Sequence, residues 1–367
     1  MSAVRSTLGW TTWLVPFIPL AVVLDVAGAS APLIFFSSAA GVIPTAALMG
    51  RATEELAERS GPGIGGLLNV TFGNAPELII ALFALGRGLH EVVKASLIGS
   101  ILGNILLVLG FSMVVGGWKR DRQRFDRTAA SAQSSMLLLA AAAMVMPAIY
   151  ALLHQGLPHP GDERVHYASN VTTISVCVAA VLMASYAAGL VFSLRTHRHL
   201  FNPPDLEVIE GAHEPWTVRR SVTMLALAGL AVGGMSEILV SSISEAAHSI
   251  GLSEFFIGAI VVAIVGNAAE HWVAVLVAAK DKMDLAINIA IGSSAQIALF
   301  VMPLLVVASY FIGPYPMALV FNGFELAGLL LAVLIANQVT NEGESTWYEG
   351  VQLLAVYAVL GIAFALA

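Results

Sequence analysis

Long apolar runs recur along the whole chain and constrain its fold more than any other feature. A helix that crosses a bilayer needs about 20 mostly apolar residues, and eleven segments meet that requirement. The runs are continuous instead of alternating between apolar and polar residues, which excludes membrane-crossing β-strands. The expected spans are 11–27, 32–56, 62–86, 92–117, 129–153, 168–194, 221–245, 254–279, 285–311, 317–338 and 347–367. The sequence therefore predicts an all-α polytopic membrane protein with about eleven transmembrane helices.

The composition supports this prediction and excludes several other classes of protein. Of the 367 residues, 58% are hydrophobic and 11% are charged, against roughly 25% charged residues in an ordinary soluble domain. A water-soluble enzyme, a disordered chain and a coiled coil are therefore excluded. The polar stretches are too short for a nucleic-acid-binding module, and the single cysteine, Cys177, cannot form an internal disulfide.

The positions of the basic residues predict the topology. With the N-terminus in the cytosol, 14 of the 17 Lys and Arg residues fall on the cytosolic side, as the positive-inside rule requires. Five of them lie between residues 118 and 127. This bias favours a multi-pass protein of the cell (inner) membrane whose N-terminus is cytosolic and whose C-terminus is outside. We expect the first segment to be retained as a span, although the small residues at 27–29 leave cleavage of a signal peptide open.

Two blocks of the sequence align without a gap when the chain is shifted by 193 residues. Residues 64–107 match residues 257–300 at eleven of 44 positions, and the polar matches are the informative ones. Gly73-Asn74-Ala75-Pro76-Glu77 aligns with Gly266-Asn267-Ala268-Ala269-Glu270, and each glutamate lies 22 residues before a Gly-Ser pair. A shared small-residue packing face would explain the Gly, Ala and Ser matches but not two glutamates in register.

The repeat predicts how the chain is divided. Residues 1–31 hold the first helix, and two five-helix repeats occupy residues 32–195 and 221–367. Because five is odd, the second repeat enters the membrane from the opposite side, which gives the inverted-repeat architecture of many secondary transporters. An acidic cytosolic connection at residues 196–220 joins the two repeats.

Each repeat places one glutamate deep in the membrane. At 1.5 Å per residue, Glu77 lies about 22 Å from the cytosolic end of its predicted helix and Glu270 about 24 Å from the outer end of its own. Both carboxylates should therefore meet near the middle of the bilayer. An isolated carboxylate at that depth costs about 2.5–3.5 kcal/mol, so it either takes a proton or binds a cation.

The residues around this pair are typical of a site for a small, hard divalent cation. Ca²⁺ takes six to eight oxygen ligands, and a soft metal would need Cys or several His, which these segments lack. Gly73, Gly266 and Pro76 favour broken helices with free backbone carbonyls. The predicted ligands besides the two glutamates are oxygens of Asn74, Asn267, Ser100, Asn104, Ser293 and Gln296.

Protons and metal would compete for the same carboxylate oxygens, which is the central requirement of an antiporter. A buried hydrogen-bonded pair of glutamates is the structural alternative. His271 could tune the proton affinity of the site, and Glu325, expected about 12 Å into its helix, could lie on a proton path. An intramembrane hydrolase is disfavoured because no nucleophile motif is present, and we expect neither enzymatic activity nor a cofactor.

At these residues the sequence resembles the Ca²⁺/H⁺ exchanger family of the cation/Ca²⁺ exchanger superfamily. The resemblance rests on GNAPELIIALFALGRG (73–88), ASLIGSILGN (95–104), GNAAEH (266–271) and INIAIGSSAQIALF (287–300), and it covers most of the chain after about residue 40. It implies two five-helix halves after an extra first helix, with Ca²⁺ and H⁺ as the exchanged substrates. It also implies metal-site roles for Glu77 and Glu270 and for the two motif asparagines.

Two departures from the family pattern matter. Pro76 makes the first motif partly similar to that of the Na⁺/Ca²⁺ exchangers, which stay open as the alternative function. The 203–214 part of the connection is only modestly acidic, which argues against a strong regulatory role. The sequence leaves open the stoichiometry, the choice among Ca²⁺, Mn²⁺ and Cd²⁺, and the oligomeric state, and it is compatible with a homo-oligomer in the lipid bilayer.

Overall fold

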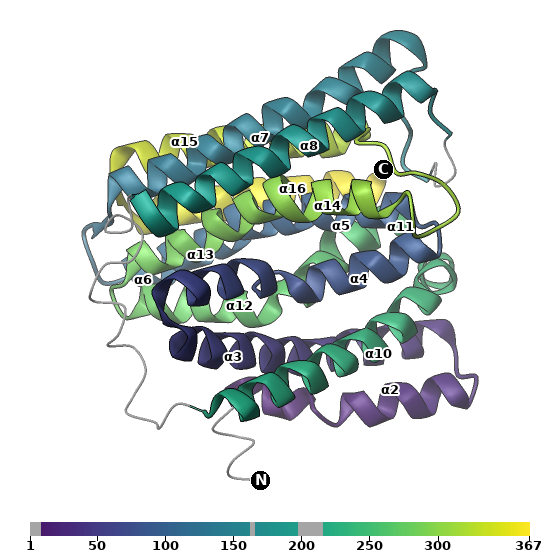
Figure 1. Cartoon of the computed structure of the whole chain (residues 1–367), viewed down its shortest axis with the longest axis horizontal. Coiled ribbons are helices and arrows are strands. Elements are labelled where there is room, and N and C mark those ends of the chain that lie inside the picture. Colours follow the sequence, from purple (N-terminus) through teal and green to yellow (C-terminus); the bar gives the residue numbers. More distant parts are fainter. Residues whose placement is uncertain (1–8, 162–165, 197–215) are drawn as a thin grey trace.

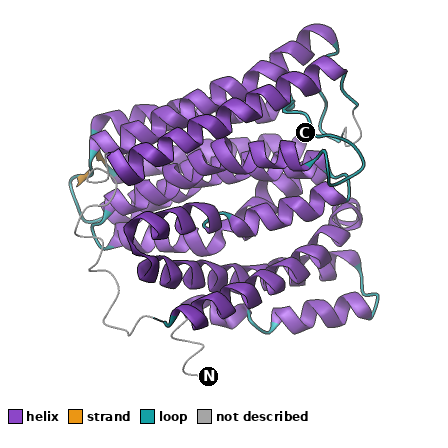
Figure 2. Cartoon of the chain, viewed as in Figure 1, coloured by secondary structure: helices purple, strands orange, loops and turns teal. Residues whose placement is uncertain are grey.

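The computed structural model of the protein describes residues 9–161, 166–196 and 216–367, and this part of the chain is almost entirely helical (Figures 1 and 2). The connection predicted at residues 196–220 lies largely outside the described residues. The α-helices are α2 (Phe17–Val26), α3 (Ala31–Phe72), α4 (Ala75–Gly86), α5 (His90–Leu102), α6 (Leu109–Gly117), α7 (Arg127–His154), α8 (Ser169–Val191), α10 (Val218–Ile250), α11 (Glu254–Phe256), α12 (Ala263–Ala279), α13 (Met283–Gln296), α14 (Met302–Ala308), α15 (Gly323–Glu342) and α16 (Trp347–Leu366).

Short irregular helical segments join some of these helices into longer rods. The 3₁₀ segment η1 (Gly9–Leu14) precedes α2, and the π-helical turns are η2 (Gly103–Val108), η3 (Phe192–Thr196), η5 (Ile257–Val262) and η6 (Ile297–Val301). Such π turns are rare and occur frequently at functional sites. Here η2 continues α5 into α6, η5 leads into α12, and η6 continues α13 into α14.

Ten stretches of the described residues are long and apolar enough to cross a membrane, which confirms the prediction of a polytopic helical membrane protein. The predicted span at 62–86 is not one unbroken helix. It is divided between the end of α3 and the 12-residue α4, with a turn at Gly73 and Asn74. Proline is tolerated in the first turn of a helix but not inside one, so Pro76 favours a new start at this position.

The chain turns back sharply between the predicted segments 32–56 and 62–86, although helical hydrogen bonding continues through this turn and α3 ends only at Phe72. A side chain at Gly65 would meet the carbonyl oxygen of Ala57 at 2.3 Å, whereas eight residues of straight helix would separate the two positions by about 12 Å. Figure 1 shows this reversal where the ribbon leaves the left end of α3 and runs back toward α4.

The helices form layers around a central group (Figure 1). Helices α2, α3 and α10 pack together on one side, and α7, α8 and α15 lie on the other. Between them, α12 contacts α3, α4, α5, α6 and α13. Helix α12 therefore lies at the centre of the molecule, where it meets helices from the first half of the chain.

Small residues allow the central helices to approach closely. A side chain at Gly99 of α5 would lie 1.9 Å from the carbonyl oxygen of Ala259 in η5, and one at Gly258 would lie 3.0 Å from that of Val92. Helix pairs in membranes are commonly stabilised by this type of contact. The packing fixes α5 against η5 and so sets the distance between the two motifs.

Loops that were predicted to share a side of the membrane do lie together. The strands β1 (Gln123–Arg124) and β2 (Glu344–Ser345) pair antiparallel, and Arg120 forms an ion pair with Asp281 at 3.1 Å. At the opposite end, the carboxylate of Glu91 accepts the backbone N–H of Gly161, and the ring of His90 contacts that of Tyr315. The first group belongs to the predicted cytosolic loops and the second to the predicted outer loops.

The prediction of a helix over 317–338 was wrong at its start. The residues from Met317 to Phe321 are buried but not helical, and α15 begins only at Gly323. Asn322 and Glu325 form a capping box that fixes this start. The hydroxyl of Ser175 accepts the N–H of Leu319 at 3.0 Å, so side chains satisfy backbone groups that a helix would otherwise have paired.

Candidate functional site

Glu77 lies at the interface between the two repeated motifs. It occupies the first turn of α4, where an acidic side chain interacts favourably with the helix dipole, and only 7% of its surface is exposed. Its side chain packs directly against Gly266 of α12, where an added Cβ atom would lie 3.5 Å from the Glu77 Oε1. The first and second motifs therefore touch at Gly266.

Glu270 lies one turn after Gly266 on α12 and interacts electrostatically with Glu77. The hydroxyl of Ser293, on α13, donates to its Oε2 at 3.2 Å. The structure therefore brings together the two glutamates that the sequence placed in register. The first motif is broken at Gly73, as expected from its proline. The prediction that Gly266 also breaks its helix was wrong, because α12 runs unbroken through the second motif, where Ala269 replaces the proline.

The other predicted ligands surround this pair and are joined by hydrogen bonds between the halves. Asn74 Nδ2 donates to Gln296 Oε1 at 2.7 Å. Asn267 Nδ2 donates to Ser100 Oγ at 2.9 Å and to the carbonyl oxygen of Ala263 at 2.9 Å. Each motif asparagine therefore binds a polar residue on a helix of the opposite repeat. These bonds hold the amide groups in fixed orientations, with their nitrogens occupied.

The oxygens of the same groups are left available. Among the described residues, Asn74 Oδ1, Asn267 Oδ1 and Glu77 Oε2 are buried and accept no hydrogen bond. Buried polar atoms in native proteins almost always have a partner, so these three oxygens, all of which belong to the two repeated motifs, require an explanation. A hard cation that binds carboxylate and amide oxygens would satisfy all three.

The composition of the site indicates which class of metal it could hold. Within the described ranges there is no group of three or more His, Cys, Asp or Glu side chains suited to a metal ion. The site instead combines two carboxylates with amide and hydroxyl oxygens. This donor set suits a hard cation such as Ca²⁺ better than a transition metal.

Comparison with known proteins identifies the family. The family model described as "Sodium/calcium exchanger protein" matches residues 30–195 and 220–365. A Ca²⁺/H⁺ antiporter of Synechocystis is 43% identical over 365 residues, which cover 96% of this chain and 95% of the relative. The Ca²⁺/H⁺ antiporter ChaA of Bacillus subtilis is 42% identical over 349 residues, which cover 95% of this chain and 96% of the relative.

The chain belongs to the sodium/calcium exchanger family, on its Ca²⁺/H⁺ antiporter branch. This confirms the resemblance found in the sequence. The solved structure of native YfkE superposes with a TM-score of 0.82 at 38% identity and covers 97% of this chain and 100% of its own. The H⁺/Ca²⁺ exchanger CAX, at 16% identity and a TM-score of 0.71, shares the fold.

In this exchanger-family chain, the two predicted proton-path residues occupy different places. The Nε2 atom of His271 lies 3.0 Å from Asn104 Oδ1, so His271 adjoins the central site. The prediction that Glu325 lies about 12 Å into its helix was wrong, because α15 starts six residues later than expected. Glu325 is in the first turn of α15, where its Oε2 accepts the N–H of Asn322 at 2.8 Å.

Glu325 belongs to a second buried charged cluster of the exchanger, formed with Glu91 and Lys94 and called the outer cluster below, which sequence reasoning missed. Only 1% of Glu325, 5% of Glu91 and 7% of Lys94 is exposed, and both α5 residues interact electrostatically with Glu325. Lys94 Nζ donates to the carbonyl oxygen of Val320 at 2.7 Å. The signal in the sequence is an acid and a base spaced three apart at the start of an apolar run.

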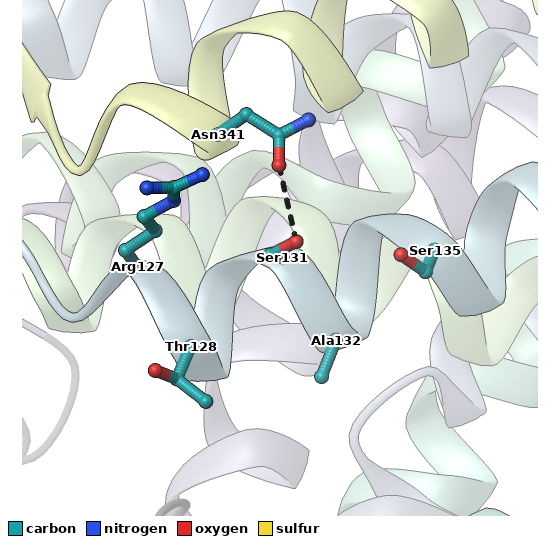
Figure 3. A pocket seen from close by; sticks show the side chains of 6 residues that line it. All are labelled: Arg127, Thr128, Ser131, Ala132, Ser135 and Asn341. Atoms are coloured by element: carbon teal, nitrogen blue, oxygen red, sulfur yellow. Dashed lines mark hydrogen bonds between the residues drawn. The ribbon is translucent and has the colours of Figure 1, made fainter.

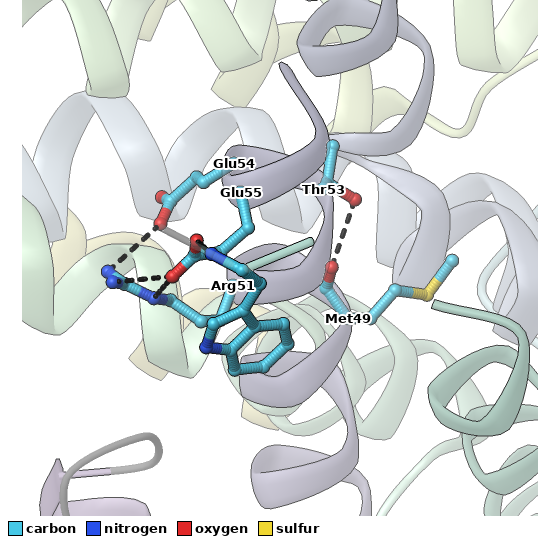
Figure 4. Close-up of polar contacts among 6 residues, drawn as sticks. Met49, Arg51, Thr53, Glu54 and Glu55 are labelled. Carbon is cyan, nitrogen blue, oxygen red and sulfur yellow. Dashed lines mark hydrogen bonds and ion pairs between the residues drawn. The ribbon is translucent and has the colours of Figure 1, made fainter. Parts of the chain in front are cut away.

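A third group of charges lies on α3 (Figure 4). Arg51 forms ion pairs with Glu55 at 2.9 Å and with Glu54 at 3.9 Å. Glu55 also accepts the backbone N–H of Trp216 at 2.7 Å, which attaches the chain just before α10 to α3. Glu54 is exposed and interacts electrostatically with Glu270, so this group of charges on α3 lies near the central site.

Proposed function

We propose that this protein is a secondary active antiporter that exchanges Ca²⁺ for H⁺ across a membrane. The observation that carries the proposal is the meeting of Glu77 with Glu270 beside oxygens of Asn74 and Asn267 that accept no hydrogen bond from the described residues. The names of the relatives support it, since two that align over nearly the whole chain are Ca²⁺/H⁺ antiporters. Ca²⁺ is then a transported substrate and not a resident cofactor.

The exchange follows from competition for the same oxygens. When Ca²⁺ is bound, the carboxylates of Glu77 and Glu270 are both ionised and neutralise its charge. When Ca²⁺ leaves, the buried carboxylate of Glu77 and the half-buried carboxylate of Glu270 repel each other, and protonation removes the repulsion. Because the two occupancies exclude each other, a proton gradient directed inward would drive Ca²⁺ out of the cytosol.

Ser100, Asn104, Ser293 and Gln296 complete the proposed Ca²⁺ site from the helices that follow each motif. Ser293 positions the Glu270 carboxylate and Gln296 positions the Asn74 amide. Gly266 lies against the Glu77 side chain, and Gly73 marks the turn where backbone carbonyls are free of the helix. The same oxygens suit Cd²⁺ less well, because this softer ion favours sulfur and nitrogen ligands, whereas carboxylate and carbonyl oxygens suit Mn²⁺ as they do Ca²⁺.

An inverted pair of five-helix repeats would explain how the site opens to each side in turn. Apart from the matched motifs, the π turns η2 and η6 support this division, because both end at positions 193 residues apart, Val108 and Val301. With the additional span at 62–86, the ten long helices become eleven crossings. The C-terminus would then face outward and the loop at residues 118–127 would face the cytosol.

Protons would reach the site through ionisable groups other than the two glutamates. His271 contacts Asn104 at the site itself and is the candidate for a neighbouring proton carrier. Glu325 would hold a proton in the outer cluster, because Glu91 and Lys94 leave that cluster with one negative charge in excess when all three are ionised. A proton on either Glu91 or Glu325 would bring the net charge of the cluster to zero.

The test is flux into proteoliposomes under an imposed pH gradient, with and without Na⁺. Ca²⁺ movement that follows the pH gradient and does not require Na⁺ is expected. Ca²⁺ movement that follows a Na⁺ gradient alone would establish the alternative, a Na⁺/Ca²⁺ exchanger, and would refute the proposal. Downhill Ca²⁺ leakage that is independent of both gradients would indicate a channel.

A further inference from the structure

A polar cavity lies between α7 and α15, at the end of the molecule that also carries the paired strands (Figure 3). Its volume is about 420 Å³, and its lining combines one guanidinium, three hydroxyls and one amide. The lining residues are Arg127, Thr128, Ser131, Ala132, Ser135 and Asn341. None of them belongs to the central site or to the outer cluster.

Arg127 is the charged group of this cavity and is not neutralised by a neighbour. Two other basic residues of the same loop form ion pairs, Arg120 with Asp281 and Arg122 with Glu344. Arg127, in contrast, has no ion pair with any described residue, and its stem packs against Gly343. The adjacent carboxylate of Asp126 caps α7 by accepting the N–H of Ala129.

The hydroxyl and amide groups around Arg127 can donate hydrogen bonds. Ser131 on α7 donates to Asn341 on α15 at 3.3 Å, which joins the two walls (Figure 3). No carboxylate lines the cavity, so it does not suit a cation. A guanidinium together with hydroxyl donors is the set of groups that recognises a phosphate.

Apolar residues continue from the cavity toward the middle of the membrane. Ser131, Ser135 and Leu139 follow one another at four-residue intervals and therefore lie on one face of α7. On α15, Leu334 lies two turns before Asn341 on the same side of the helix. Leu139 is 70% exposed and Leu334 is 55% exposed, so each helix presents first a polar and then an apolar surface.

We propose that this cavity binds the phosphate headgroup of an anionic glycerophospholipid of the cytosolic leaflet, with an acyl chain along Leu139 and Leu334. The order of the surfaces matches the order of the groups in such a lipid. The five basic residues between 118 and 127 would attract anionic lipids to this end of the protein. The bound lipid would brace α7 against α15 beside the cytosolic loops.

The test measures lipid bound to the purified full-length protein in nanodiscs of phosphatidylcholine with phosphatidylglycerol. Arg127→Gln is expected to reduce bound phosphatidylglycerol by about fivefold, as the loss of one basic contact near an anionic surface predicts. Arg124→Gln is the matched control, because it removes the same charge from the same loop outside the cavity. Ser135→Leu fills the cavity without a change of charge and should also displace the lipid if Arg127→Gln does not fold.

Each other outcome would overturn the proposal. An equal loss in Arg124→Gln and Arg127→Gln would mean that the loop attracts lipid only through its total charge. Protection of the protein against heat by inorganic phosphate, as strong as that by phosphatidylglycerol, would identify a site for free phosphate. A change of oligomeric state in Ser135→Leu, with bound lipid unchanged, would show that a second copy of the chain covers this face.

Discussion

Replacement of Glu77 by glutamine tests the central site directly. The substitution keeps the size of the side chain and removes one of the two charges that would neutralise Ca²⁺. Removing one partner of a buried charge interaction costs about 3–5 kcal/mol. Ca²⁺ affinity should therefore fall by about two to three and a half orders of magnitude.

The same variant should fold normally, which separates a loss of binding from a loss of structure. Glu77 Oε2 accepts no hydrogen bond from the described residues, and in the metal-free protein the Glu77 carboxylate interacts electrostatically with that of Glu270. A neutral amide relieves this repulsion, so the thermal midpoint without Ca²⁺ should stay equal or rise. Ca²⁺ should stabilise the wild-type protein much more than the variant, because a ligand stabilises only the state that binds it.

The assay is ⁴⁵Ca²⁺ binding to the purified protein, together with Ca²⁺ flux in proteoliposomes. Glu245→Gln is the matched control, because Glu245 is an exposed glutamate on α10 outside the site. Wild-type Ca²⁺ affinity and coupled flux in Glu77→Gln would refute the assignment of the site. A thermal midpoint that falls in the absence of Ca²⁺ would show instead that Glu77 stabilises the fold.

Three further predictions test other parts of the structure. If two carboxylates exchange protons for Ca²⁺, the apparent Ca²⁺ affinity should weaken on acidification with a slope of about two protons per ion, and Glu77→Gln should bring this slope toward about one. Isothermal titration at several pH values measures the slope, and an affinity independent of pH in the wild type would contradict competition. Gly99→Ala places a methyl group against the carbonyl oxygen of Ala259 and should lower the free energy of unfolding by about 1–3 kcal/mol. Gly361→Ala places its methyl group in open space and should not destabilise the protein. Equal melting temperatures of the two variants would argue against the close α5–η5 contact. Lys94→Met removes the donor to the carbonyl oxygen of Val320 and should lower the free energy of unfolding by about 1–3 kcal/mol. The same substitution at the exposed Lys119 is the matched control, and unchanged melting of Lys94→Met would show that this hydrogen bond does not hold the extended segment before α15.

The sequence predicted the parts of the fold that depend on hydropathy and on polar residues in register. Long apolar runs fix helices because every backbone group in lipid must be paired within the protein, and the two glutamates could be found because a buried charge is costly in any fold. The start of α15 could not be found in this way. Met317 to Phe321 are as apolar as a helix, and only the Asn322–Glu325 capping box distinguishes them from one.

The buried charges near the membrane surface could not be interpreted from the sequence for a related reason. An acid or base at the edge of an apolar run has the same sequence pattern whether water or protein surrounds it. Glu91 and Lys94 are buried because Gly161 and Val320, which are far away in the sequence, supply their partners. The hydrogen bonds between Asn74 and Gln296 and between Asn267 and Ser100 likewise depend on packing between the halves.

The two glutamates are matched in sequence but not in their surroundings. Glu270 lies in an unbroken helix and is held by the hydroxyl of Ser293, whereas Glu77 begins a short helix after a turn and one of its oxygens has no donor among the described residues. We therefore expect Ser293 to keep the Glu270 carboxylate in place when a bound cation leaves, whereas no described donor holds Glu77 Oε2. Pro76, which is present in the first motif and absent from the second, is the residue that creates this asymmetry, because it requires a helix to start where the second motif continues one.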